Sequence, residues 1–262
     1  SVFRADEATL LIAGDISIEE AKPILERLFG DWKSPGSSPS SAPVPSLPAH
    51  DGLRVVLVDR PDAVQTVIRY VLPGVKYSSD SRVTLRMLNT LFGGGFTSRL
   101  NQNIREQHGF AYGAGSRFVM QPSTGYFIAS SSVKADVTGP ALAEFIKEFG
   151  RLKAGDVTEA EAGKARETLR TDLVQAFQGL RGLMGAASEV VLNGMPFDTL
   201  GKDAARMGDV NAADLNQAAK SDVLVDQGVL VLVGDKKLIL DQIKELGLPA
   251  PIEVGPDGAP KK

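Results

Sequence analysis

One short stretch of the sequence, LFGGGFTSRLNQNIREQHGFAYGAGSRF, concentrates the residue types that could do chemistry. Within it, Arg105 and Tyr112 stand seven positions apart, on either side of a predicted turn at Gly109. A fixed cation and a phenolic donor beside one turn can hold a peptide carbonyl or stabilise an oxyanion. Structural roles also account for both residues, since a cation is favourable at a helix C-terminus and a tyrosine can pack in a strand. From the residues alone, the structural interpretation is the stronger one.

The same stretch contains three consecutive glycines, Gly93, Gly94 and Gly95, directly before a predicted helix. Helix N-termini attract anions, so a phosphate cradle is one interpretation of this pattern. A P-loop would need Gly-Lys-Ser/Thr at its end, whereas FTS follows here, and a dinucleotide fingerprint would need a preceding strand rather than a helix. Glycines serve turns far more often than ligands, so the sequence argues against nucleotide binding.

Histidine and cysteine are too scarce for most catalytic centres. The 262-residue chain has no cysteine and only two histidines, His50 and His108, which excludes thiol catalysis, disulfides and cysteine-ligated zinc. A zinc site needs three protein ligands, and neither HExxH nor HxxEH occurs in the sequence. Ser98 and Ser116 lack the GxSxG setting and a histidine base. The sequence therefore predicts no catalytic residue, no metal ligand and no cofactor bound by this chain.

The bulk composition is typical of a globular protein. Hydrophobic residues make up 43% of the chain and charged residues 23%, which are ordinary proportions, and no apolar run is long enough to cross a bilayer. The formal net charge of −3 gives no electrostatic reason to expect nucleic acid as a partner.

Apolar periodicity and turn residues predict the elements that must position the stretch. Strands are predicted over residues 53–60, 63–73, 111–121, 125–135 and 228–235. Helices are predicted over residues 79–93, 97–107, 136–153, 158–177, in further segments to about 219, and after the last strand to 246. Together these elements predict a two-layer α+β domain over residues 51–250, with a mainly antiparallel sheet covered by helices on one face.

Two segments of the sequence resemble each other. ATLLIAGDISIEEAKPILERLFG near the start and GVLVLVGDKKLILDQIKELG near the end both predict a strand, Gly-Asp and an amphipathic helix. Residues 1–32 are therefore expected to be the last strand–helix unit of a preceding related domain. Residues 33–50, with five prolines and six serines, predict a linker, and residues 251–262 a tail. The exposed edge of the first strand could pair with a second copy of the chain.

The ordered set of motifs resembles the insulinase/pitrilysin family of zinc metallopeptidases, specifically the noncatalytic half that carries no zinc. The most distinctive match is to the family block GGxxSRLxxx[IL]RExxGxxY. The strand–helix unit at the start, the hairpin VVLVDRPDAVQTVIRYVLPG and the closing segment VLVLVGDKKLILDQIKELGLPAPIEVGPDG are also similar to the family's pattern. The resemblance covers most of the chain.

The resemblance implies one half of a clamshell around a peptide chamber. A homologous domain bearing the inverted HxxEH motif and the zinc would lie opposite, supplied in cis or in trans. Arg105 and Tyr112 match the family's pair that grips the peptide substrate near the scissile bond. Gly93, Gly94 and Gly95 match a substrate-contacting loop of noncatalytic subunits. Because this chain lacks the zinc motif, we expect it to be inactive alone.

Another class of function stays open at this point. Some relatives serve as structural subunits, so the chain could be a scaffold or peptide-binding module without a catalytic role. The presence of both Arg105 and Tyr112 favours substrate gripping, because a scaffold does not need the pair. The resemblance is compatible with a bacterial periplasmic or membrane-associated setting and does not identify the substrate.

Overall fold

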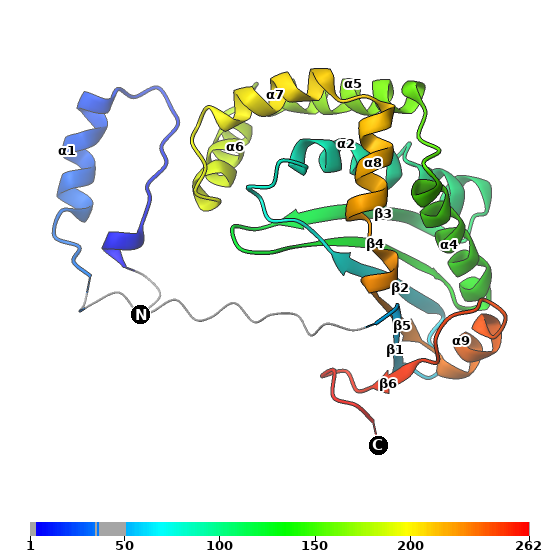
Figure 1. Ribbon diagram of the computed structural model, residues 1–262. Coiled ribbons are helices and arrows are strands. Elements are labelled where there is room, and N and C mark those ends of the chain that lie inside the picture. Colours follow the sequence, from blue (N-terminus) through cyan, green and yellow to red (C-terminus); the bar gives the residue numbers. More distant parts are fainter. Residues whose placement is uncertain (1–3, 35, 37–50, 262) are drawn as a thin grey trace. The chain divides into compact units, whose positions relative to one another are not determined.

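The computed structural model describes residues 4–34, 36 and 51–261. The chain divides into two compact units, one of residues 1–47 and 171–201 and the other of residues 48–170 and 202–262 (Figure 1). The larger unit contains all the predicted site residues, and it is built on a sheet. Among the described helices, none combines the length and the hydropathy that a membrane crossing requires.

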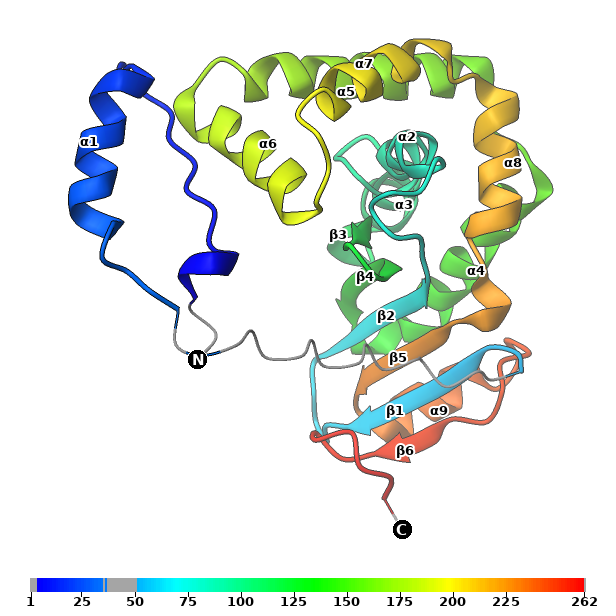
Figure 2. The same cartoon turned by 60° about the vertical axis from the view of Figure 1, so that its left-hand side comes forward.

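The sheet of the larger unit has six strands in the described residues, in the order β3-β4-β2-β5-β1-β6 (Figure 2). These strands are β1 (Arg54–Asp59), β2 (Gln65–Pro73), β3 (Ala111–Met120), β4 (Gly125–Lys134), β5 (Val229–Gly234) and β6 (Ile252–Val254). The pairings β3–β4, β4–β2 and β2–β5 are antiparallel, whereas β1 lies parallel to both of its neighbours. The sheet is therefore mixed, with most of its pairings antiparallel. This agrees with the predicted α+β domain with a mainly antiparallel sheet.

The end of the chain differs from the predicted tail over residues 251–262. β6 falls within that segment and pairs in parallel with β1, Ile252 lying opposite Val56. The Lys261 ammonium then lies 3.0 Å from the Glu253 carboxylate and holds the last residues against the strand. Three residues are too few for an alternating pattern to stand out, so no periodicity in the sequence indicates this strand.

Helices cover one face of the sheet, as predicted. The helices of this unit are α2 (Arg82–Phe92), α3 (Arg99–Asn101), the π-helix η2 (Gln102–Gln107), η3 (Ala135–Val137), α4 (Thr138–Ala154), α5 (Glu159–Ala176), α7 (Thr199–Asp209), α8 (Ala212–Asp222), η4 (Val225–Gln227) and α9 (Lys236–Ile243). The ends of α5 and α7 extend into the smaller unit. Along β2, every second residue is buried, because only one face of the strand packs against the helices.

Aromatic rings fill the space between the sheet and its helices. Phe149 on α4 lies at the centre of this cluster, with its ring 5.1 Å from the rings of Tyr70 on β2 and Phe92 on α2. Its ring is also 6.3 Å from that of Phe127 on β4. Aromatic pairs at these separations stabilise the fold by more than the burial of their apolar area alone. The cluster therefore fixes α2 and α4, the two helices that flank the candidate site, on the sheet.

The smaller unit contains η1 (Ala5–Glu7), α1 (Ile18–Phe29) and α6 (Leu180–Leu192). Ser17 and Glu20 form a capping box at the start of α1. Residues 8–14 were predicted as a strand, but the structure assigns no strand to them. A strand needs a hydrogen-bonded partner, and no described residue pairs with this segment. The linker predicted over residues 33–50 lies almost entirely outside the described residues.

The central position of Phe149 gives a prediction for stability. Phe149→Ala should lower the free energy of unfolding by about 3–5 kcal/mol, because it leaves a cavity among the surrounding rings. Urea denaturation followed by circular dichroism measures the loss. Ile146→Ala on the same helix is the control, since Ile146 is 37% exposed, and it should cost much less. Equal losses in the two variants would contradict the central role of Phe149.

Candidate functional site

The three glycines form a loop that leaves the end of α2 and approaches β3 closely. The N–H groups of Gly93 and Gly94 both donate to the carbonyl oxygen of Asn89, at 2.9 and 2.7 Å. A Cβ atom on Gly93 would lie 2.5 Å from the backbone nitrogen of Ser116, which no side chain can tolerate without a shift. Gly95 is exposed and has open space around it. Close approach therefore requires glycine at position 93, whereas position 95 is free of this constraint.

Polar contacts fasten the loop to the edge strand β3. The Ser116 N–H donates to the Gly93 carbonyl oxygen at 2.8 Å, and the Ser116 hydroxyl donates to Asn89 Oδ1 at 2.8 Å. Asn101 accepts from the Ala114 N–H at 3.3 Å and donates to the Phe96 carbonyl oxygen at 2.7 Å. Part of the free edge of β3 is thus paired with the loop, which holds the loop in one position.

Arg105 lies on η2 and contacts Phe96, the residue directly after the glycine loop. Its guanidinium carbon is 4.3 Å from the ring centroid of Phe96, a cation–π contact, and its Nε lies 3.3 Å from the Glu106 carboxylate. The π-helical turn, seen in the His108 N–H bond to the Asn103 carbonyl, is a rare geometry that often occurs at functional sites. The structure therefore places Arg105 against the residue that follows the three glycines, with the Arg105 side chain 37% exposed.

Tyr112 lies at the start of β3, beyond the turn at Gly109, whose φ of +62° suits glycine. The pairing of β3 with β4 shifts register between Ala111 and Ala114, and Tyr112 stands in this irregular segment with 93% of its surface exposed. Such irregularities redirect side chains at the edges of sheets. Among the described contacts, none joins Tyr112 to Arg105, so the two residues flank the turn without bonding to each other.

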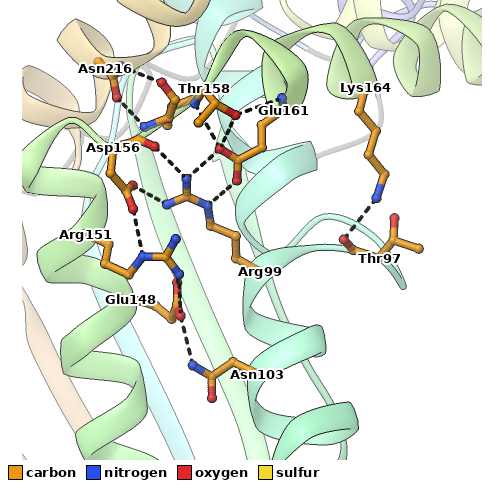
Figure 3. A network of polar contacts seen from close by, with 11 residues as sticks. Thr97, Arg99, Asn103, Glu148, Arg151, Asp156, Thr158, Glu161, Lys164 and Asn216 are labelled. Atoms are coloured by element: carbon orange, nitrogen blue, oxygen red, sulfur yellow. Dashed lines mark hydrogen bonds and ion pairs between the residues drawn. The ribbon is translucent and has the colours of Figure 1, made fainter.

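An ion-pair network around the buried Arg99 supports this region, and the sequence did not reveal it (Figure 3). The Arg99 guanidinium, which is buried, binds both oxygens of the Glu161 carboxylate at 2.7 and 2.8 Å and Asp156 at 2.5 Å. Glu161 also accepts from the Thr158 N–H at 3.0 Å, and the Thr158 hydroxyl accepts from the Glu161 N–H, which forms a capping box at the start of α5. Arg99 is part of the family block GGxxSRLxxx[IL]RExxGxxY. Its partners Asp156 and Glu161 are 57 and 62 positions away in the sequence, and no local pattern predicts them.

The network continues toward the helix that carries Arg105. Arg151 bridges the carboxylates of Asp156 at 2.8 Å and Glu148 at 3.1 Å. The buried Asn103 on η2 donates to Glu148 at 2.9 Å and to Glu144 at 2.7 Å. Figure 3 shows Asn103 of η2 joined to Glu148 of α4, and Arg151 of α4 joined to Asp156 just before α5. The helical segment that presents Arg105 is therefore held to the body of the unit by charge-assisted hydrogen bonds.

The contacts of His108 give it a structural role. Its ring stacks on Phe110 at 4.8 Å, and its Nε2 lies 3.8 Å from the Glu144 carboxylate. Within the described part of the chain, no group of three or more histidine or acidic side chains is arranged to hold a metal ion. His50 lies outside the described residues. The chemistry that the site offers is thus a cation, a phenol and a glycine loop.

A known protein family matches most of this chain. The peptidase M16 inactive domain family matches residues 1–169, and the chain belongs to this family. A crystal structure of a peptidase M16 inactive domain from Pseudomonas fluorescens superposes with a TM-score of 0.73 at 20% identity, covering 85% of this chain and 52% of that one. At this identity the superposition establishes the fold, and the predicted metallopeptidase resemblance is confirmed.

Two curated relatives are longer than this chain. A Rickettsia bellii protein named "uncharacterized zinc protease" is 30% identical over 175 residues, which are 66% of this chain and 40% of that protein. A Bacillus subtilis protein named "probable inactive metalloprotease" is 20% identical over 185 residues, which are 70% of this chain and 42% of that protein. The chain thus spans less than half the length of these two relatives.

The glycine loop gives a prediction with a matched control. Gly93→Ala should lower the free energy of unfolding by about 1–3 kcal/mol, because the new Cβ atom meets the backbone of β3. Gly95→Ala should change it by less than about 0.5 kcal/mol, since nothing lies within 4 Å of the added atom. Chemical denaturation of both variants measures the difference. Tolerance of alanine at position 93 would show that the loop is not held as described.

The network makes stability depend on acid pH. Burial alone raises the pKa of Glu161, but hydrogen bonds from Arg99 and Thr158 outweigh it and lower the pKa from 4.5 to about 2. A lowered carboxyl pKa contributes stability that is present above pH 4.5 and is lost as the pH falls toward 2. Glu161→Gln should therefore lower the melting temperature most above pH 4.5, and the difference from the native chain should shrink on acidification.

Thermal melts across this pH range test the prediction. Glu245→Gln, at an exposed position, is the control and should melt like the native chain throughout. A difference between Glu161→Gln and the native chain that stays constant with pH would mean that the carboxylate charge of Glu161 does not stabilise the fold.

Proposed function

We propose that this chain is the substrate-gripping half of a zinc-dependent endopeptidase. The observation that carries the proposal is that an almost fully exposed Tyr112 and a partly exposed Arg105 flank one turn, in a chain of the peptidase M16 inactive domain family. Exposed polar groups on rigid supports are typical of binding sites. A zinc-bearing homologous domain would face this site, either in the same polypeptide or as a separate subunit.

Each residue has a distinct role in this proposal. The Tyr112 hydroxyl would donate a hydrogen bond to a backbone carbonyl of the peptide near the scissile bond, and the Arg105 N–H groups would hold a neighbouring carbonyl. Gly95 leaves the loop low enough for the peptide to pass close to its backbone. Zinc in the partner domain would polarise the scissile carbonyl and activate water. This chain would supply orientation and charge stabilisation to that reaction.

The lengths of the relatives support a second, zinc-bearing part. The chain covers 40% of a relative that is named a zinc protease. Its own described residues contain no group suited to metal binding. In the proposed arrangement, the zinc ligands therefore come from the part of the assembly that this chain does not include.

The alternative is a peptide-binding scaffold derived from a peptidase. It is favoured by the relative that is named a probable inactive metalloprotease. A scaffold would bind an extended peptide without cleaving it, even when its partner is present. Because the gripping pair has no use in a purely structural subunit, we place the enzymatic role first.

Replacement of single groups in the assembled enzyme tests the proposal. Tyr112→Phe should lower kcat/KM about tenfold to hundredfold, because one donor to the developing charge is lost, while the zinc content stays unchanged. Arg105→Gln should lower it by a similar factor. Tyr126→Phe is the control, since Tyr126 lies on β4 at the far end of the hairpin. Peptide hydrolysis and atomic absorption provide the two measurements.

Each result has a clear meaning. Full turnover in Tyr112→Phe would overturn the gripping role of Tyr112. A loss of zinc in the same variant would mean that the tyrosine acts through the assembly of the two halves. Binding of a peptide by the complete assembly, with no cleavage product, would favour the scaffold.

A further inference from the structure

The charged residues on the face of the sheet turned away from the helices all have the same sign. Arg69 points to this face, because its neighbours Ile68 and Tyr70 on β2 are fully buried on the other. Strand register identifies the other residues of the same face. The charged residues at its outward positions on β1 to β5 are Arg54, Arg69, Arg117 and Lys134. All four are cations, although the chain as a whole has a net charge of −3.

Arg69 shares a hollow with Tyr112. The hollow has a volume of about 450 Å³, and its lining includes Arg69, Tyr112, Gly113, Gly115, Ser130 and Ser132. The register places Gly115, Ser130 and Arg69 in one row across β3, β4 and β2. The two glycines carry no side chain to fill the hollow, so backbone and serine hydroxyls are accessible beside the guanidinium.

The chemistry of the hollow is that of an anion site. Arg69 is the charged residue of its lining, and no acidic side chain is among the described residues there. A guanidinium recognises a carboxylate through two parallel hydrogen bonds, and serine hydroxyls can donate further ones. A lysine or arginine of a bound peptide would find no counter-charge in this place and would be repelled.

We infer that this hollow selects a carboxylate of the peptide substrate, and that Arg69 is a specificity-determining residue. The inference rests on the proposed function, because it takes Tyr112 as the point where the peptide backbone is held. A peptide that is held at Tyr112 in an extended form would place an acidic side chain, or its own C-terminal carboxylate, over Ser130 and Arg69. The two sources present the same group to the same guanidinium.

Matched peptides separate these sources. The full chain is titrated with a series of fluorescent peptides that are uncharged except for one Glu, whose position differs from peptide to peptide. Each peptide is compared with a counterpart that has Gln at that position. Every peptide is made with a free and with an amidated C-terminus, and anisotropy gives Kd. At the responsive position, Glu should bind roughly threefold to tenfold more tightly than Gln, as expected for a partly exposed charged hydrogen bond. The preference should decline with added salt.

Two variants assign the effect to Arg69. Arg69→Gln should abolish the preference for the carboxylate, so that each Glu peptide and its Gln counterpart bind with the same Kd. Arg117→Gln is the matched control, because it removes a cation of the same face that does not line the hollow. It should keep the preference. A preference confined to peptides with a free C-terminus would identify the terminal carboxylate as the ligand group.

Other outcomes overturn the inference. Equal binding of Glu and Gln peptides, or a preference that survives in Arg69→Gln, would exclude a specificity role for Arg69. If binding in those cases still weakens in Tyr112→Phe, the proposed function stands and only the anion site fails. No binding of any peptide by the folded chain would overturn the inference, whereas the kcat/KM of Tyr112→Phe in the assembled enzyme decides the proposed function separately.

Discussion

The buried charge of Arg99 is the constraint on which the site region depends. A guanidinium removed from water must be paired, and Arg99 is paired twice, with Glu161 on α5 and with Asp156 just before it. Removing one partner of a buried pair typically costs about 3–5 kcal/mol, because the other charge stays buried without compensation. The start of α5 therefore cannot move away from α3 without exposing or orphaning that charge.

This constraint passes to the exposed residues through short links. η2 follows α3 directly, and Asn103 ties it to the carboxylates of α4. Arg105 extends from the same turn onto Phe96, the residue directly after the glycine loop, and the loop is fixed in turn by the close approach of Gly93 to β3. Arg105 and Tyr112 thus lie on elements whose positions are set by buried contacts. This limits the orientations of the two side chains that a bound peptide would meet.

Much of this fold could be predicted from the sequence, because helix and strand periods are local. Patterns a few residues long predict the hairpin strand that carries Tyr112 and the helix that carries Arg105. The capping box at Thr158 also follows from such a pattern. Long-range partners could not be predicted in this way, and Asp156 and Glu161 are found only from the coordinates. Alternation along β2 turns Arg69 outward, but only the register places it beside Ser130. The residues alone also left Arg105 and Tyr112 with a structural interpretation, and the family pattern supplied their proposed role.

In the proposed function, one face of the sheet serves stability and the other face serves recognition. The inner face buries Tyr70 and Phe127 against Phe149, and its packing leaves no freedom for variation. Residues of the outer face alternate with these along the same strands, so each outward side chain inherits a rigid position from its buried neighbours. Arg69 is held in this way by Ile68 and Tyr70 on either side. Because its place is set by the core, its charge can change with little effect on folding, which is the property that a specificity-determining position requires.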